Sequence, residues 1–345
     1  MKIRNQQQQL DTFIIAELSA NHNNKLEVAL KTVREMAKAG ANAVKVQTFR
    51  PESMTLNLNN DLFKTRTDSA WAGQKLFDLY QKGALPYGWH TPIQKQAHDV
   101  GLEFFSSPFD EEAVDFLEKM KVPRYKVASL EINHTPLLKY IAKQGKPMIL
   151  STGVSRLSDI DHALETITTE GNNDISLLKC TTAYPTLPEE SELSHIKWLK
   201  EHYQLTVGLS DHSMSKHIPS IAVALGATII EKHFILDRKM GGIDSHFSLE
   251  PSEFKAMVDL VRETEKSLGG FAYKLHPKGI SARKSMRSII VTKKINKGEL
   301  LSRENIAVLR PGNGLHPMNY DEIIGKKVLY DLEIGTPLQF QMILK

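Results

Sequence analysis

Strand-like and helix-like stretches alternate along the chain from residue 13 to about residue 268. Short apolar runs are each followed by a stretch whose apolar residues recur with the helical period of about 3.6 residues. The first pair shows the pattern, because FIIAELSA is followed by LEVALKTVREMAKAG, in which Gly40 is the expected helix stop. The pattern therefore predicts repeated strand–helix units.

Eight such units fill this part of the chain, which is the number that closes a (β/α)8 TIM barrel. A doubly wound open sheet is the competing architecture, but no glycine-rich dinucleotide turn follows the first strand. Longer connections near residues 50–86 and 235–250 follow the second and eighth strands, so we expect both at the C-terminal face, where barrel enzymes build their active sites. The expected strands are 13–20, 43–49, 102–109, 124–129, 147–153, 175–182, 206–212 and 228–234.

The pattern changes after the Gly269–Gly270 pair. Residues 271–287 are basic and irregular, as in a linker, and short β-like runs (SIIVT, VLYDL) with turn signals follow from Ser288. We therefore expect a catalytic barrel over residues 1–270, a linker over 271–287 and a small β-rich domain over 288–345.

Charge is unevenly divided between these parts. The chain of 345 residues has a net charge of +4, but residues 271–345 hold 13 Lys and Arg against 6 Asp and Glu, a net of +7, which leaves −3 for residues 1–270. The total is too mild to indicate a nucleic-acid partner, and no run is long enough to span a membrane. The single cysteine, Cys180, and the absence of an apolar signal core favour a cytoplasmic protein without disulfides.

Two histidines end neighbouring strand-like segments in the stretch 206–234. TVGLSDH ends at His212, and TIIEKHF carries His233. In adjacent parallel strands of a barrel, the two imidazoles would lie side by side at its mouth. Neutral imidazoles beside acidic and hydroxyl groups predict a divalent-metal site with open positions, whereas each histidine taken alone is typical of an ordinary strand end.

Two lysines and several hydroxyls occupy other strand ends. Lys45 and Gln47 share one face of the second strand, and Lys126 lies on the fourth. A lysine inside a barrel needs a counter-charge, and two lysines with hydroxyls predict a phosphate or carboxylate pocket. The alternative is that both extend outward between helices. The hydroxyl residues at these ends are Ser107, Ser129, Ser151, Thr182, Tyr184 and Ser210.

Glu131 is the best candidate for a general acid or base, because it follows the fourth strand close to a lysine. Its alternative role is that of a surface acid beside a helix N-terminus. A Schiff base on one lysine would make the protein a class I aldolase, but the histidine pair argues against that need. Cys180 is a weaker nucleophile candidate because it lies inside an apolar strand.

The motifs AELSANHN, AGANAVKVQTF, FFSSPFDEEAVDFLE, YKVASLEI, KPMILSTG, LLKCTTAYP, VGLSDHS and ALGATIIEKHF occur in order along the barrel. With them the chain resembles the sialic acid synthase family, whose members condense phosphoenolpyruvate with a sugar to make nonulosonic acids. LRPGNGLHP is similar to the signature of the family's antifreeze-like (SAF) C-terminal domain. The resemblance covers essentially the whole chain.

The resemblance also implies roles for single residues. His212 and His233 match the family's metal ligands, with Mn²⁺ or Mg²⁺ as the ion, and Glu131 matches its acid/base glutamate. Arg310 matches an arginine that the small domain inserts into the partner's barrel in a domain-swapped homodimer. Positions that line the phosphoenolpyruvate site match Lys45, Ser107, Lys126, Ser129, Ser151 and Ser210. Positions that contact the sugar or the metal's water match Gln47, Thr182, Tyr184 and Asp244.

SANHN, SSPF and GGIDSHFSLEP favour the subgroup that makes pseudaminic acid, with the open-chain form of 2,4-diacetamido-2,4,6-trideoxy-L-altrose as the sugar. An N-acetylneuraminate or legionaminate synthase is the alternative on the same barrel. A carbohydrate-binding or ice-binding protein is the alternative in another class, but the tail has no regular threonine array. A pure binder also has no need of Lys45, Lys126 and Glu131.

Overall fold

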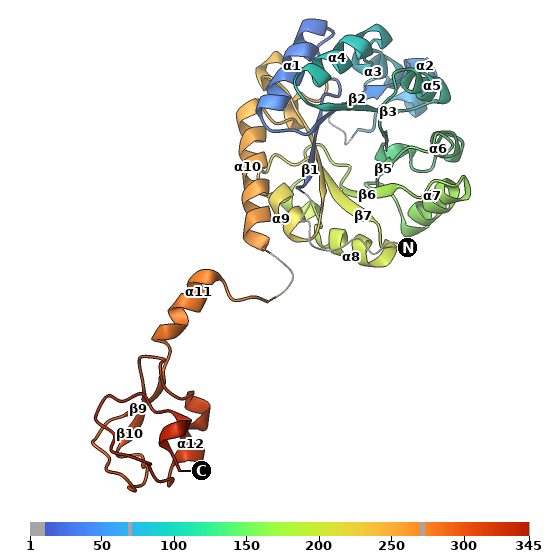
Figure 1. The fold of residues 1–345 in the computed structure, drawn as a ribbon. Coiled ribbons are helices and arrows are strands. Elements are labelled where there is room, and N and C mark those ends of the chain that lie inside the picture. Colours follow the sequence, from blue (N-terminus) through green and yellow to red (C-terminus); the bar gives the residue numbers. More distant parts are fainter. Residues whose placement is uncertain (1–10, 68–70, 270–272, 345) are drawn as a thin grey trace. The chain divides into compact units, whose positions relative to one another are not determined.

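The computed structural model describes residues 11–67, 71–269 and 273–344 and divides the chain into two compact units, Met1–Gly269 and Gly270–Lys345 (Figure 1). Each unit has its own apolar core. No helix among the described residues is long and apolar enough to cross a membrane.

The first unit is a closed barrel of eight parallel strands, in which β1 pairs with both β2 and β8. This confirms the predicted TIM barrel. Every strand lies within a predicted run, because buried parallel strands are nearly continuous in apolar residues. The strands are β1 (Phe13–Glu17), β2 (Ala43–Thr48), β3 (Glu103–Pro108), β4 (Tyr125–Val127), β5 (Met148–Ser151), β6 (Ile175–Cys180), β7 (Thr206–Asp211) and β8 (Ile229–His233).

Helices surround this barrel, and each buries one apolar stripe against the strands (Figure 1). In α1 the buried stripe includes Ala29, Val33 and Met36. Local signals set the helix ends: Asp110 accepts a hydrogen bond from the amide of Ala113 at 2.6 Å and so caps α5. The outer helices are α1 (Leu26–Lys38), α4 (Tyr87–Asp99), α5 (Glu111–Lys119), α6 (Thr135–Ala142), α7 (Leu157–Thr169), α8 (Ser194–Tyr203), α9 (Ile218–Ala224) and α10 (Pro251–Leu268).

The long connection after β2 is more ordered than its polar sequence indicates. It contains two short helices, α2 (Pro51–Met54) and α3 (Leu76–Gly83). The indole Nε1 of Trp71 donates to the carbonyl of Ile243 at 3.0 Å, which joins this connection to the one after β8. The two long connections therefore meet at the C-terminal face of the barrel.

The strands of the second unit match the sequence prediction only in part. Helix α11 (Pro277–Ala282) lies within the stretch predicted to be an irregular linker, and β9 (Ser288–Val291) pairs antiparallel with β10 (Ile306–Leu309). The run VLYDL does not form a strand. It makes only isolated bridges, Val328 to Ile343 and Leu332 to Ile295, and only these two end residues of the run enter the core. A short helix, α12 (Tyr320–Ile323), completes the unit.

Candidate active site

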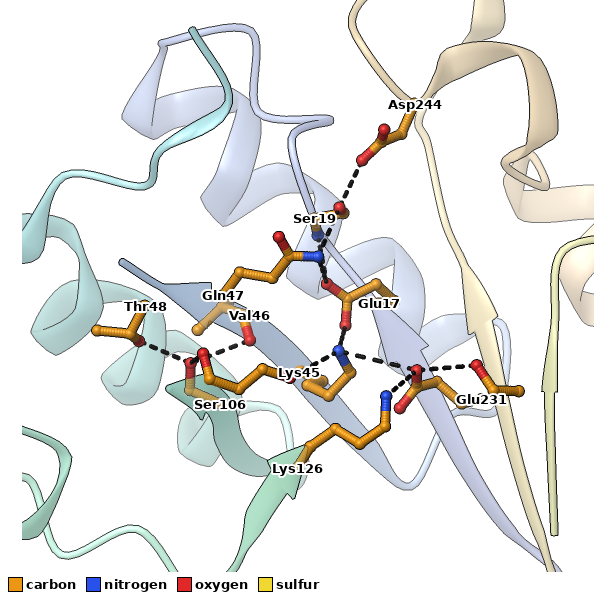
Figure 2. Close-up of polar contacts among 12 residues, drawn as sticks. Glu17, Ser19, Lys45, Val46, Gln47, Thr48, Ser106, Lys126, Glu231 and Asp244 are labelled. Carbon is orange, nitrogen blue, oxygen red and sulfur yellow. Dashed lines mark hydrogen bonds and ion pairs between the residues drawn. The ribbon is translucent and has the colours of Figure 1, made fainter. Parts of the chain in front are cut away.

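The barrel mouth holds a network of buried charged side chains (Figure 2). Lys45 on β2 forms an ion pair with Glu17 on β1, and its Nζ lies 3.8 Å from Oε1 of Glu231 on β8. None of the three is more than 3% exposed. Glu17 and Lys45 are register partners on neighbouring strands, so the strand pairing itself brings the opposite charges together.

Lys126 reaches the same carboxylate from β4, on the opposite side of the barrel. Its Nζ lies 2.9 Å from Oε1 of Glu231, and Ser210 on β7 donates to that oxygen at 3.2 Å. Burial alone would raise the pKa of Glu231, but the two ammonium groups outweigh it and lower this pKa to about 2. Both lysines therefore point into the barrel, where the ionised Glu231 supplies their counter-charge.

A chain of polar contacts leads from this network to the connection after β8. Gln47 donates through Nε2 to Oε1 of Glu17 at 3.4 Å and to Oγ of Ser19 at 3.1 Å, and Ser19 donates to the carboxylate of Asp244. Figure 2 shows these side chains in one line from β2 to the β8 connection. Burial has the largest effect on the pKa of Asp244 and raises it, whereas the hydrogen bond from Ser19 lowers it. Gln47 and Asp244 thus lie at one side of the mouth.

Glu131 follows β4 in a short 3₁₀ turn, Ser129–Glu131. Burial raises the pKa of its carboxyl to about 7, and the nearby Lys126 opposes this rise only in part. Its buried Oε2 has no hydrogen-bond partner among the described residues. A carboxyl with this pKa exchanges a proton readily at neutral pH, as general acid–base catalysis requires.

The hydroxyl residues form a ring at the ends of β3 to β6. Ser107 accepts a hydrogen bond from Lys45 at 3.3 Å, and Ser129 accepts one from the amide of Gly153 at 3.0 Å. Ser151 Oγ and Thr182 Oγ1 are buried and have no partner within the described part of the chain. Buried polar atoms are normally hydrogen-bonded, so these two are available to a ligand.

The ring is crowded at Gly153. A Cβ atom there would lie 2.3 Å from Oγ1 of Thr182 and 2.9 Å from Oγ of Ser129. Only glycine allows the backbone to pass this close to the two hydroxyls.

The two histidines lie side by side, with ring centroids 5.3 Å apart. Nδ1 of His212 donates to the carbonyl of Thr181 at 3.0 Å, so in the neutral ring Nε2 is the nitrogen that can bind a metal. Burial, together with the charge of His212, lowers the pKa of His233 well below its usual value, and the buried Nδ1 of His233 has no partner among the described residues. His233 is therefore held neutral. Burial lowers the pKa of His212, but Cys180 and the carbonyl of Thr181 outweigh this and raise it, so His212 binds a metal in its deprotonated form.

This donor set fits a divalent ion only in part. The described residues contain no group of three or more His, Cys, Asp or Glu side chains arranged to hold a metal. Two imidazoles can supply two ligands, and water or substrate oxygens would have to complete the coordination, as in sites that keep open positions.

Aromatic side chains pack around the histidines. The Tyr184 ring lies 4.4 Å from that of His212 and 4.9 Å from that of Phe247, and Phe247 lies 4.7 Å from His233. Trp71 packs on Tyr184 at 5.7 Å. The hydroxyl of Tyr184 is held protonated, because burial raises its pKa. These rings shield one side of the mouth from water.

Arg310 lies in the second unit, at the end of β10. It is exposed and precedes a cis peptide bond to Pro311. Within the described part of the chain, its side chain makes no hydrogen bond or ion pair with another residue of this unit. The guanidinium is therefore free to bind another group.

The two carboxylates that hold the lysines were not predicted as site residues from the sequence. Glu17 ends β1 and Glu231 lies in the middle of β8, and each lies in register with a site residue on a neighbouring strand, Lys45 and Ser210 respectively. The requirement of a buried lysine for a counter-charge, combined with this register, was the signal that could have identified them. Ser19 was also missed, because a hydroxyl in a turn carries no distinctive pattern.

Comparison with known proteins gives a consistent result over both units. The NeuB family model matches residues 32–273, and the SAF domain model matches residues 286–344. A pseudaminic acid synthase of Campylobacter jejuni is 44% identical, over 98% of each chain. An N,N'-diacetyllegionaminic acid synthase of the same species is 38% identical, over 91% of this chain and 95% of that protein. The crystal structure of an N-acetylneuraminic acid synthetase from Leptospira borgpetersenii superimposes with a TM-score of 0.71 at 31% identity, covering 79% of this chain and 90% of that one.

Proposed function

Because the chain belongs to the NeuB family and carries a SAF domain after its barrel, we propose that it acts as a pseudaminic acid synthase. The reaction condenses phosphoenolpyruvate with 2,4-diacetamido-2,4,6-trideoxy-L-altrose and gives pseudaminic acid and phosphate. The observation that carries the proposal is the pair of buried lysines, Lys45 and Lys126, held at the mouth by Glu231 beside unpartnered hydroxyls.

Phosphoenolpyruvate carries a carboxylate and a phosphate, and the mouth offers a separate cation for each. Lys45 on β2 and Lys126 on β4 both approach Glu231 on β8, so the two ammonium groups are already positioned before substrate binds. The hydroxyls of Ser151 and Thr182 are available to the remaining anionic oxygens. Much of the rate is expected from this positioning.

In the reaction, C3 of phosphoenolpyruvate attacks the aldehyde carbon of the open-chain sugar, and a water adds to the cation left at C2. The resulting tetrahedral centre loses phosphate by cleavage of its C–O bond and becomes the keto acid. The water loses one proton and the former aldehyde oxygen gains one, so the protons balance. Glu131, with a pKa of about 7, can take the first and return the second.

His212 and His233 would hold a divalent ion such as Mn²⁺ or Mg²⁺. Such an ion supplies Lewis-acid polarisation of the sugar aldehyde when it is bound. The hydrogen bond from His212 to the carbonyl of Thr181 orients the imidazole toward this task. Gln47 and Asp244 lie where they can contact the sugar, and Tyr184 closes the site against water.

We assign Arg310 to the barrel of a partner subunit, in a domain-swapped homodimer. Its unpaired guanidinium suits the hydroxyls and the amide carbonyl of an acetamido sugar. The net charge of +7 on residues 271–345 and of −3 on the remainder favours docking of a small domain on a barrel.

A legionaminate or N-acetylneuraminate synthase is the second candidate, because the legionaminic acid synthase of Campylobacter jejuni is 38% identical, against 44% for the pseudaminic acid synthase. All three reactions use the same bond changes and differ in the sugar. The identity difference favours the first assignment.

The chemistry can be tested with phosphoenolpyruvate that carries ¹⁸O at the bridging oxygen. We expect sugar-dependent release of phosphate that contains the label, because the C–O bond breaks. Label retained in the keto acid, or phosphate release that does not depend on the sugar, would contradict the proposed reaction.

A further inference from the structure

A cavity of about 540 Å³ lies between α7 and α8, against the ends of β5 and β6. Small-molecule sites commonly have volumes of about 300–1,000 Å³. Cys180 at the end of β6 faces His212 inside the barrel, so the preceding residue, Lys179, points to the helix side of the strand. Lys179 therefore lines the cavity from the helix side of β6, whereas Lys45 and Lys126 point into the barrel.

Lys179 differs from the other lysines that the barrel buries. Four lysines are buried among the described residues, and three of them have carboxylate partners: Lys45 pairs with Glu17, Lys126 with Glu231 and Lys232 with Asp211. Lys179 is only 5% exposed and forms no ion pair within the described part of the chain.

The hydrogen bonds of Lys179 leave part of its ammonium group unsatisfied. Nζ donates to the carbonyl of Cys180 at 3.0 Å and to Oγ1 of Thr181 at 2.6 Å, whereas an ammonium has three donors. The carboxylate of Glu192, at the rim of the cavity, raises the pKa of Lys179 slightly against the effect of burial, but it lies beyond ion-pair distance. Burial lowers the pKa of Lys179, which reflects the missing counter-charge. A buried cation that faces an open cavity favours an anion there.

The rest of the lining divides into a cationic part and an apolar part. Arg156 and His195 also line the cavity and add donors to it, and His195 lies 3.7 Å from the exposed Glu192. Leu157 and Trp198 are partly exposed on the other walls, and the indole of Trp198 stacks on His202 at 4.4 Å. A planar or apolar group fits against this second part.

We propose that the cavity between α7 and α8 binds a small organic anion, a carboxylate or phosphate carried on a planar or apolar group, with Lys179 as its counter-charge. Arg156 assists at the rim, and Trp198 contacts the apolar portion. The site is independent of the proposed reaction, because none of these three residues belongs to the barrel mouth.

The test uses full-length protein labelled with 5-fluorotryptophan. The chain has three tryptophans, so ¹⁹F NMR gives three signals, of which Trp198 reports on this cavity and Trp71 on the barrel mouth. Phenyl phosphate, benzoate and inorganic phosphate are the anionic probes, and benzyl alcohol is the neutral one. The Trp71 signal shows whether a probe also enters the barrel mouth.

We expect phenyl phosphate or benzoate to shift the Trp198 signal saturably, and benzyl alcohol to leave it unchanged. The stronger of the two anions identifies the preferred acid group. In Lys179→Met the dissociation constant should rise at least about tenfold, the factor that corresponds to one lost charged contact of about 1.4 kcal/mol. Lys197→Gln, which changes an exposed lysine next to Trp198 on α8, should bind as the wild type does.

Three results would overturn the proposal. The first is a Trp198 signal that no anion moves, and the second is an equal shift in wild type and Lys179→Met. The third is a signal that changes with protein concentration alone, because that would mean that a second copy of the chain covers the cavity. If Lys179→Met fails to fold, Arg156→Gln, which changes an exposed side chain, replaces it. The affinity of that variant for the anionic probe must then fall for the proposal to stand.

Discussion

Lys126 on β4 and Glu231 on β8 meet across the interior of the barrel, with 2.9 Å between Nζ and Oε1. The pair joins opposite sides of the mouth, and Lys45 approaches the same carboxylate from a third strand at 3.8 Å. The carboxylate of Glu231 thus holds two ammonium groups. Among the described residues, Glu17 is the only other carboxylate that forms an ion pair with either lysine, and it pairs with Lys45. The arrangement serves both the stability of the barrel and the binding of a doubly anionic substrate.

Replacement of Glu231 by glutamine should destabilise the barrel by about 3–5 kcal/mol at pH 7, the usual cost of leaving a buried charge without its partner. Urea unfolding followed by tryptophan fluorescence measures this, since all three tryptophans lie in the first unit. The folded-state pKa of Glu231 is about 2, below the ordinary value of 4.5. Its contribution is therefore fully present above pH 4.5, and the difference between variant and wild type should shrink as the pH falls toward 2.

Asp99→Asn is the matched control for this change. Asp99 pairs with Lys95 at 2.6 Å, but both side chains are more than half exposed, so little stability should be lost. Equal losses in the two variants would contradict the role given to Glu231.

The pH dependence of kcat/KM should show a limb near pH 7 that belongs to Glu131. If the carboxylate is the active form, the rate rises with pH through the pKa of about 7. Glu131→Gln should remove the limb and lower kcat/KM by a factor on the order of 10²–10⁴. An unchanged limb in the variant would assign the titration to another group.

Stability separates this catalytic role of Glu131 from a structural one. The carboxyl has a folded-state pKa above its ordinary value of 4.5, so its contribution to stability is greatest below pH 4.5 and is lost as the pH rises through about 7. Glu131→Gln cannot ionise, and its melting temperature at pH 8 should equal or exceed that of the wild type. A lower melting temperature would indicate that Glu131 is needed for folding.

Removal of metal should abolish turnover, and Mn²⁺ or a similar ion should restore it. His212→Ala and His233→Ala should each lose this restoration while they remain folded. Binding of Mn²⁺, followed by its electron paramagnetic resonance signal, should weaken in both variants independently of activity. Full activity in a chelated, metal-free sample would exclude the metal role.

Arg310→Ala should lower kcat/KM by a factor on the order of 10²–10³, as expected for loss of one preorganised stabilising group. The trans arrangement has a sharper test, in which inactive Arg310→Ala protein is mixed with inactive His212→Ala protein under conditions of subunit exchange. Activity should reappear, because one barrel in each mixed dimer is intact and receives an intact arginine. No recovery despite proven exchange would mean that Arg310 does not act in trans.

The barrel was predictable because its signals are local and repeated. Each strand is a short apolar run bounded by a helix of clear period, and closure into eight units follows from their number. The second unit was less predictable, because most of its chain is irregular. The run VLYDL contributes Val328 and Leu332 to the core through bridges, not through a strand.

The site was predictable where a residue type is unusual for its position. Lysines inside a barrel and histidines at adjacent strand ends stand out in the sequence, and the structure brings both sets to the mouth. Glu17 was not assigned, because an acidic residue at a strand end is common, and only register with Lys45 reveals its role. The pKa of Glu131 depends on burial by residues far apart in the sequence, which no local pattern encodes.

The most direct test of the proposed function is a competition among sugars in one reaction. The enzyme, phosphoenolpyruvate and Mn²⁺ are mixed with equal concentrations of 2,4-diacetamido-2,4,6-trideoxy-L-altrose, N-acetylmannosamine and the sugar substrate of the legionaminic acid synthases, and the products are counted by mass spectrometry. We predict that pseudaminic acid dominates by a factor on the order of 10² or more, because a site that pairs the substrate's polar groups rejects sugars that leave them unpaired. Equal yields, or a predominance of N-acetylneuraminic or legionaminic acid, would contradict the assignment.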